Sequence, residues 1–350
     1  GYFPYAKDKF ELVNPEQSKT ETLSQTILSA NMFFGDTICT LLTFLNRSKI
    51  IRFHENLAKF LIEDVSKLTQ AERKVVMSVV LHALKILTRY KRIIYFAFYC
   101  SVGAGVVKSF YVVFTAEKPL IWWSHSLIGL PIVFLFWGIA STLRLLPRLL
   151  MITILYTFRI CPYITNIQLE KVNQICFVTN EDCQRILSSY RKQEMLTAQL
   201  NDAFGWCLTV DMLLMVISLI TLLFSVLVCL SVKEYAGAFS FGWALILHAA
   251  IVFELCNASY VFEAESRKSA ILLKNIPIHR LEHISRVQKF FIPLMDLTFQ
   301  IIMLKAKLLS LPLVINPGSF FHVNRRTITG IFSAITTYLI VLVQFHNGED

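Results

Sequence analysis

The clearest chemical pattern in the 350-residue chain lies in a charge-free stretch near its end, residues 327–345. Its small and polar residues follow one another at spacings of three and four: Gly330, Ser333, Thr337, Val341 and Gln344. On a helix these residues share one face. Such a stripe on an apolar helix suits close packing against other helices, or contact with a water-filled lumen. Packing explains the small residues well, and it explains the amide of Gln344 less well.

A second group of residues could bind a small polar molecule, because such sites combine aromatic walls with a few polar groups. The candidates lie toward the expected outer ends of the apolar segments: Asp36, Tyr111, Trp123, His125, Trp137, Phe241, Trp243 and His248. A tryptophan at the end of a membrane span is often an interface anchor, and one inside a span often serves packing. We expect Trp243 and His248 to be the principal ligand contacts.

The pattern of nucleophilic and metal-binding residues does not indicate an enzyme. The eight histidines are dispersed, and the eight cysteines contain no C-x-x-C pair or histidine-spaced cluster. We therefore expect no catalytic residue, metal site or cofactor.

The composition indicates which elements must position these residues. The chain is 55% hydrophobic and 17% charged, whereas soluble domains are roughly 25% charged. Apolar runs of about 20 residues are long enough to cross the hydrocarbon core as helices. The sequence therefore predicts an all-α polytopic membrane protein, and it excludes a disordered chain and a disulfide scaffold. Six spans are expected near 23–46, 93–114, 120–143, 204–232, 236–261 and 327–346, with the third continuing as a helix to about 160.

The basic residues orient these spans. Of the 34 Lys and Arg residues, 28 lie in segments 47–92, 144–192 and 267–326, while the opposite loops contain only Lys118 and Lys233. Because cytoplasmic loops are enriched in Lys and Arg, the three basic segments are predicted to be cytoplasmic and the C-terminus extracellular. The net charge of +10 is thereby explained without nucleic acid.

Lysines near the start of the chain require an odd number of crossings. Lys7, Lys9 and Lys19 place the first residues in the cytoplasm, although residue 22 should be outside. We therefore expect a seven-span architecture with the N-terminus inside and the C-terminus outside, one span being absent from this chain between about Val13 and Thr22. Three parts are expected: an N-terminal segment at 1–22, a ligand-binding helical bundle with cytoplasmic extensions at 23–310, and a pore helix with the outer mouth at 311–350. The extensions should pack together as an anchor domain.

The end of the last predicted span resembles one protein family. Residues Thr337 to Phe345 read TYLIVLVQF, which is similar to the TYhhhhhQF motif of insect gustatory receptors, where h is hydrophobic. The preceding GSFFHVNR at 318–325 and the GYFPY at 1–5 also resemble segments of that family. In the main sugar-receptor branch a Glu commonly follows the motif Tyr, and here Leu339 stands there. This departure leaves fructose-type, bitter-type and carbon-dioxide-type receptors open.

The resemblance implies a tetrameric, ligand-gated, non-selective cation channel in the plasma membrane of chemosensory neurons. Four copies of the last helix would line one pore, and a ring of Gln amides could close it by mutual hydrogen bonds. The residues assigned to the pore and gate are Gln344, Phe345, Val341 and Thr337. Those assigned to subunit packing are Tyr338, Thr337 and Gly330. The expected partners are a small tastant such as the sugar fructose, monovalent and divalent cations, the lipid bilayer, and identical or related subunits.

Two rival classes remain beside the homotetrameric channel. The chain could be one subunit of a heteromeric chemosensory receptor of the carbon-dioxide or bitter type, since one sequence does not report its partners. A G-protein-coupled receptor is less favoured, because its N-terminus would be outside and neither a DRY nor an NPxxY motif occurs.

Overall fold

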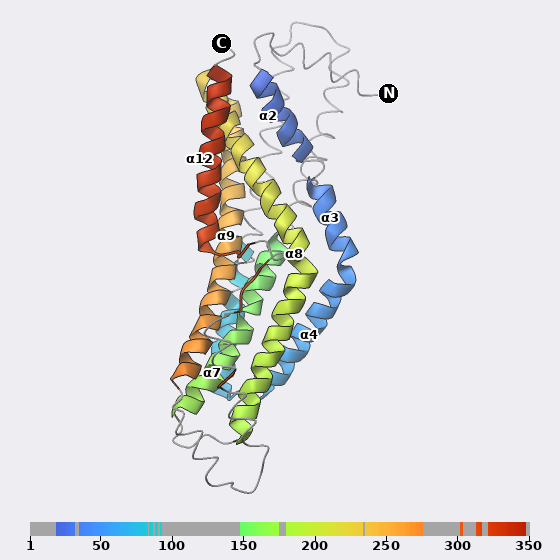
Figure 1. The fold of residues 1–350 in the computed structure, drawn as a ribbon, viewed down its shortest axis with the longest axis vertical. Helices are drawn as coiled ribbons and strands as arrows, with labels where there is room; N and C mark the ends of the chain where they lie inside the picture. The colour runs from blue at the N-terminus through green and yellow to red at the C-terminus, as the bar shows by residue number, and fades with distance from the viewer. Residues whose placement is uncertain are drawn as a thin grey trace. The chain divides into compact units, whose positions relative to one another are not determined.

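The computed structural model describes residues 19–31, 35–82, 84–86, 88–89, 92, 148–174, 180–233, 235–275, 302–303, 313–316 and 321–347. The regular structure of these residues is helical, with no strand among them (Figure 1). The labelled helices are α2 (Lys19–Ala30), α3 (Asp36–Leu45), α4 (Arg47–Ser66), α7 (Ile160–Gln174), α8 (Asn180–Ser231), α9 (Tyr235–Lys274) and α12 (Arg325–Asn347). Residues 70–82 and 148–158 are also helical.

Four helices of the described chain are long and apolar enough to cross a membrane: Arg148–Gln174, Gln184–Ser231, Gly237–Lys274 and Arg325–Phe345. The last three contain the predicted spans 204–232, 236–261 and 327–346, apart from the ends of these ranges. The prediction of an all-α polytopic membrane protein is confirmed. The predicted spans 93–114 and 120–143 lie outside the described residues.

The predicted span 23–46 corresponds to two shorter helices, α2 and α3. Residues 32–34 between them lie outside the described residues. A Cβ added at Gly35 would approach Leu214 Cδ1 to 2.9 Å and Asn31 Oδ1 to 3.1 Å. The absence of a side chain at Gly35 therefore allows the close approach of the chain to α8 at this point.

The chain divides into two compact units. Unit 1 comprises Gly1–Thr40, Val210–Val252 and Ile328–Asp350, and unit 2 comprises Leu41–Thr209 and Phe253–Thr327. Helices α8, α9 and α12 each contribute residues to both units. The three functional parts expected from the sequence, 1–22, 23–310 and 311–350, divide the chain differently and stay a prediction.

An aromatic cluster forms the core of unit 2. Phe53 of α4 and Phe158 are fully buried, with ring centroids 5.8 Å apart in an edge-to-face arrangement. Phe158 stacks on Phe262 of α9 at 4.8 Å, and Phe204 of α8 contacts Phe53 at 6.2 Å. Four helical segments thus meet at four rings, which are large apolar groups that interact favourably in these geometries.

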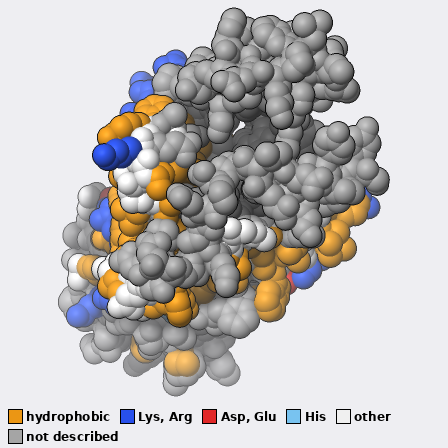
Figure 2. All heavy atoms as spheres, turned by 90° about the horizontal axis from the view of Figure 1, so that it is seen from above, with side chains coloured by type: hydrophobic (Ala, Val, Ile, Leu, Met, Phe, Trp, Pro, Cys, Tyr) orange, Lys and Arg blue, Asp and Glu red, His pale blue; other side chains and the backbone are white. Residues whose placement is uncertain are grey.

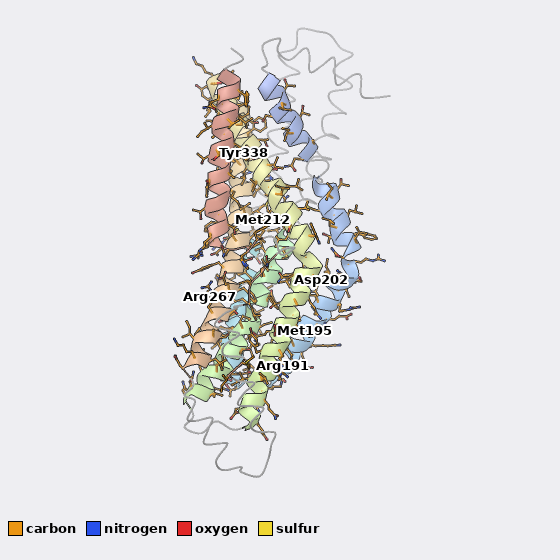
Figure 3. The ribbon with its side chains drawn as sticks, in the orientation of Figure 1. Arg191, Met195, Asp202, Met212, Arg267 and Tyr338 are labelled. Atoms are coloured by element: carbon orange, nitrogen blue, oxygen red, sulfur yellow. The ribbon has the colours of Figure 1, made fainter. Side chains whose placement is uncertain are left out.

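Helices α4 and α8 pack antiparallel in unit 2. Side-chain contacts between them include Lys49 Nζ to Asp202 Oδ1 at 2.8 Å, Asn56 Nδ2 to Gln199 Oε1 at 3.0 Å, and Lys192 Nζ to Glu63 Oε2 at 2.6 Å. Asp202 is labelled on α8 in Figure 3. Along this series the residue numbers on α4 increase while those of the partners on α8 decrease, so the two helices run in opposite directions. Leu57 and Phe60 are buried, so one face of α4 contributes to the core of unit 2.

Helices α7 and α9 run parallel, because the residue numbers of the contacting pairs increase along both helices together. Arg159 Nη2 lies 2.8 Å from Glu265 Oε1, and Asn166 Nδ2 lies 3.1 Å from the other oxygen of the same carboxylate. Further along, Asn173 Nδ2 donates to the carbonyl oxygen of Leu272 at 3.0 Å. The relative directions of α4, α7, α8 and α9 agree with the alternation of spans that the charges predict.

Glu72 links the helix at 70–82 to α7. Its carboxylate lies 2.7 Å from Lys171 Nζ and accepts the backbone N–H of Thr69 at 2.8 Å, which makes the Thr69–Glu72 pair a capping box. Burial by itself raises the pKa of Glu72, but hydrogen bonds from Lys171 and Thr69 outweigh it, so the net pKa is lower than 4.5.

We predict that Glu72→Gln destabilises the protein at neutral pH and has little effect in acid. A carboxyl whose folded-state pKa is lowered stabilises the fold above its unfolded value of 4.5, and this stabilisation is lost as the pH falls through the folded pKa. The loss at pH 7 should be under about 1 kcal/mol, because Lys171 is 44% exposed. Thermal unfolding of the detergent-solubilised protein at pH 7 and pH 3 measures this. Glu55→Gln on the exposed side of α4 is the control, and an equal loss at both pH values would contradict the prediction.

Candidate pore helix and ligand site

The start of α12 is determined by side chains next to it in sequence. Asn324 Oδ1 accepts the backbone N–H of Arg326 at 2.9 Å, so Asn324 is the N-cap of α12. Thr327 Oγ1 donates to the carbonyl of His322 at 2.7 Å and accepts the N–H of Asn324 at 3.2 Å. The reciprocal contacts satisfy donors that the first turn of a helix leaves without intrahelical partners.

The segment before α12 is bound to two other helices of unit 2. Asn201 of α8 accepts the backbone N–H of Asn316 at 3.0 Å and donates to the carbonyl of Val314 at 3.3 Å. Ser266 Oγ of α9 accepts the N–H of Leu313 at 3.1 Å. These contacts hold extended backbone against α8 and α9 just before the last helix begins.

Little of α12 is covered by the chain itself. Among its described side chains only Ile331 and Ile335 are buried, and both are apolar. The residues predicted for the polar stripe, the pore and the subunit contacts are all exposed: Gly330, Ser333, Thr337, Tyr338, Val341, Gln344 and Phe345. Tyr338 lies in the middle of the helix (Figure 3) and is 60% exposed. Outside the stripe, Phe332 is also exposed, whereas Leu339 and Leu342 are half-buried.

The polar groups along α12 differ in what they can bind. Thr337 Oγ1 donates to the carbonyl of Ser333 at 2.9 Å, so its proton is used within the helix. A Cβ added at Gly330 would meet nothing within 4 Å. The space beside Gly330 is therefore open in the single chain, and another helix backbone could approach there closely.

Three predicted ligand contacts lie on α9. Phe241 and Trp243 are partly exposed, whereas His248 is buried and its Nδ1 donates to the carbonyl of Ala244 at 2.9 Å. Asp36 begins α3, but its side chain lies outside those described. The remaining candidates, Tyr111, Trp123, His125 and Trp137, also lie outside the described residues.

Polar contacts between α8 and the first two helices were not part of the predicted site. In unit 1, Asn31 Nδ2 donates to Ser218 Oγ at 2.7 Å and to the carbonyl of Leu214 at 2.9 Å. Cys39 Sγ lies 4.0 Å from Asp211 Oδ1. Asn31 and Asp211 are polar residues within apolar runs, which is the signal by which the sequence marks them. Their partners are 172 to 187 positions away, and no spacing rule connects them.

The surface of the described helices is rich in apolar side chains. Figure 2 shows hydrophobic side chains over much of the described surface on one face, with Lys and Arg at separate points. On α9 and α12 the exposed large apolar residues are Tyr235, Phe239, Ile246, Phe253, Tyr260, Ile271, Phe332, Tyr338, Ile340, Val341 and Phe345. Exposed apolar surface of this extent indicates contact with lipid or with other protein chains.

Comparisons with known proteins agree with this architecture. A family model described as 7tm Chemosensory receptor matches residues 27–348. The structure of the insect olfactory receptor OR5 from Machilis hrabei is similar, with a TM-score of 0.66 and 14% identity, covering 94% of this chain and 82% of that chain. The same receptor in complex with eugenol gives a TM-score of 0.70 at 14% identity, covering 94% and 83%. Among curated proteins, none matches this chain.

The helices and their apolar surfaces define a polytopic all-α membrane protein, and the similarity to OR5 shows that the fold is shared with a chemosensory receptor. Since the family model matches nearly the whole chain, the protein belongs to the 7tm chemosensory receptor family. This is a family of receptors, not of enzymes.

The N-cap contact of α12 leads to a stability prediction. Asn324→Ala removes the acceptor for the N–H of Arg326 and should cost about 1 kcal/mol, the usual effect of losing an Asn cap. Asn324→Asp keeps an acceptor oxygen in the same place and should remain close to wild type. Thermal unfolding of the purified protein in detergent compares the two variants, and equal losses in both would contradict a capping role.

Proposed function

We propose that the chain is a gustatory receptor, in which a tastant opens a non-selective cation channel lined by α12. The observation that supports this most is the Thr337–Phe345 motif on a helix that its own chain leaves almost uncovered. An exposed Gln in a span is costly against lipid and is stable against water or another subunit. If several copies of α12 surrounded one axis, Gln344 would contact both water in the pore and a neighbouring subunit.

The gate is proposed to be a ring of Gln344 and Phe345. Amides of neighbouring subunits would donate and accept in turn, each bond contributing about 0.5–1.5 kcal/mol to the closed state. Phe345 would narrow the pore at the same level and keep water out of this constriction. Thr337 and Val341 continue the lining on the same face.

Subunit packing is proposed along the part of α12 next to this lining. Open space beside Gly330 and the exposed side chains of Thr337 and Tyr338 would be covered by a neighbouring copy. A homotetramer would bury these surfaces, and a heteromer with related subunits would bury them equally well. Co-expression with related receptors distinguishes the two.

The ligand is proposed to be a small molecule, with a sugar such as fructose as the first candidate, bound in an outer pocket that includes Phe241, Trp243 and His248. Partial exposure of Phe241 and Trp243 supports this, since aromatic groups that a ligand can reach form the walls of such sites. A structure of the similar receptor OR5 is of its complex with eugenol. The remaining proposed contacts are Asp36, Tyr111, Trp123, His125 and Trp137.

We predict that Gln344→Ala and Phe345→Ala raise the basal cation current or change its block by large cations. Gln344→Ala removes the proposed ring of about four hydrogen bonds, which would shift the equilibrium by a few kcal/mol. Phe345→Ala removes the apolar constriction at the same level. Whole-cell recording from cells that express this chain alone, with fructose, a bitter alkaloid, carbon dioxide and eugenol as probes, measures this.

Phe332→Ala is the matched control, because it makes the same change at an exposed phenylalanine of α12 outside the stripe. Wild-type basal current, response and block in both gate variants at normal surface expression would contradict the gate. Absence of current from the wild-type chain alone, with current on co-expression of a related receptor, would instead support the heteromeric reading.

A further prediction concerns the orientation in the membrane. The 28 basic residues in segments 47–92, 144–192 and 267–326 favour a cytoplasmic position for these segments and an extracellular C-terminus. An epitope after Asp350 should bind antibody on intact cells, and an epitope at the exposed Thr69–Gln70 turn should bind only after permeabilisation. The opposite staining pattern would overturn the proposed orientation.

A further inference from the structure

The first residue of α12 is held on two sides by α9. Arg325 Nη2 donates to Asn257 Oδ1 at 2.9 Å, and its guanidinium carbon lies 4.1 Å from the ring centroid of Tyr260. Asn257 and Tyr260 are three residues apart, so they occupy neighbouring positions on α9. A planar cation that donates to an amide and also stacks on an aromatic ring is bound with a defined orientation.

Asn257 also forms a hydrogen bond with the helix at 148–158. Its Nδ2 donates to Tyr156 Oη at 3.0 Å, and Tyr156 Oη in turn donates to Glu254 Oε2 at 2.8 Å. Tyr156 is buried, and the carboxylate of Glu254 is on α9, one turn before Asn257. All five residues belong to unit 2.

The donors in this chain of contacts have only one consistent arrangement. Arg325 has donors and no acceptor, so Asn257 must turn its oxygen toward it. The amide nitrogen of Asn257 then faces Tyr156, whose oxygen accepts. The single phenolic proton of Tyr156 is therefore left for Glu254. A cation at one end and a carboxylate at the other favour the same direction for every bond between them.

The chain of contacts joins three segments that are distant in sequence. Tyr156 lies 98 residues from Glu254, and Asn257 lies 68 residues from Arg325. On its other side, the start of α12 follows the segment 313–316, which is bound to α8 and α9. The start of α12 is thus held by α9 directly, and the orientation of the holding amide depends on the helix at 148–158.

We propose that Tyr156 and Asn257 are positioning residues for α12, which hold its first turn through Arg325 in the closed state of the channel. A shift of the helix at 148–158 against α9 breaks the contact between Tyr156 and Asn257, frees the amide to rotate and releases Arg325. The effect on gating rests on the proposed function, whereas the control of the start of α12 rests on the contacts alone.

Hydrogen–deuterium exchange of the purified full chain tests the structural part. Tyr156→Phe keeps the ring and removes the hydroxyl, so exchange of the amides of residues 329–335 should rise about fivefold, the ratio given by a lost bond of about 1 kcal/mol. Glu254→Gln removes the charge that favours this direction of the bonds but keeps an acceptor oxygen for Tyr156, so it should raise exchange in α12 by less than Tyr156→Phe. Arg325→Lys keeps the charge and loses the planar stack on Tyr260, so it should raise exchange in α12 and leave residues 148–158 unchanged.

Tyr163→Phe is the matched control, since it removes a hydroxyl from a tyrosine of α7 outside this chain of contacts. Faster exchange limited to residues 148–158 and α9 in Tyr156→Phe would overturn the proposal, and so would an equal rise in α12 with Tyr163→Phe. Should Tyr156→Phe fail to fold, the Arg325→Lys variant decides, and unchanged exchange in α12 there would overturn the proposal as well.

Basal sodium current, recorded without any added ligand, tests the gating part. Tyr156→Phe should raise the open fraction about fivefold relative to wild type, while Tyr163→Phe should not. Faster exchange in α12 with unchanged basal current would overturn the role in gating. No current from the wild-type chain, alone or with related receptors, would overturn the channel function and leave the exchange result standing.

Discussion

Backbone groups within the hydrocarbon core of a membrane must find their hydrogen-bond partners inside the same segment, and the rest of this structure depends on that requirement. It explains why the membrane-spanning segments of the described chain are helical. Once the backbone is satisfied within each helix, only side chains can determine which helix lies beside which. In unit 2 the neighbours are specified by a buried phenylalanine cluster and by polar contacts at its edges.

The polar contacts of unit 2 form two series with different geometry. Along α4 and α8 they are ion pairs and amide bonds between largely exposed groups, which contribute little energy each and define the antiparallel register. Along α7 and α9 they are more buried and include the carboxylate of Glu265, which accepts from both Arg159 and Asn166. A half-buried carboxylate is stabilised by such partners, because a charge that is partly removed from water is destabilising when it has none.

The last helix differs from the others in what covers it. Its start is held by neighbouring side chains and by α9, whereas most of its remaining length is exposed. A helix that is held at one end and uncovered along its length can respond to a change at that end by moving as a whole, since its own hydrogen bonds keep it stiff. This combination suits a pore-lining helix whose other contacts come from further subunits.

The sequence by itself determined the fold class, the three apolar spans confirmed in α8, α9 and α12, and the chemosensory receptor family. These follow from local rules: hydrophobic length, helical spacing and a contiguous motif. Only the tertiary structure decided that Tyr156, Asn257 and Arg325 meet, and that Asn31 bonds to Ser218 across 187 positions. The sequence marks Asn31 as a polar residue in an apolar run but does not identify its partner, because a hydrogen bond between two helices leaves no periodicity in either of them. Its existence depends on the direction and rotation of both helices, which are set by the packing of the whole unit.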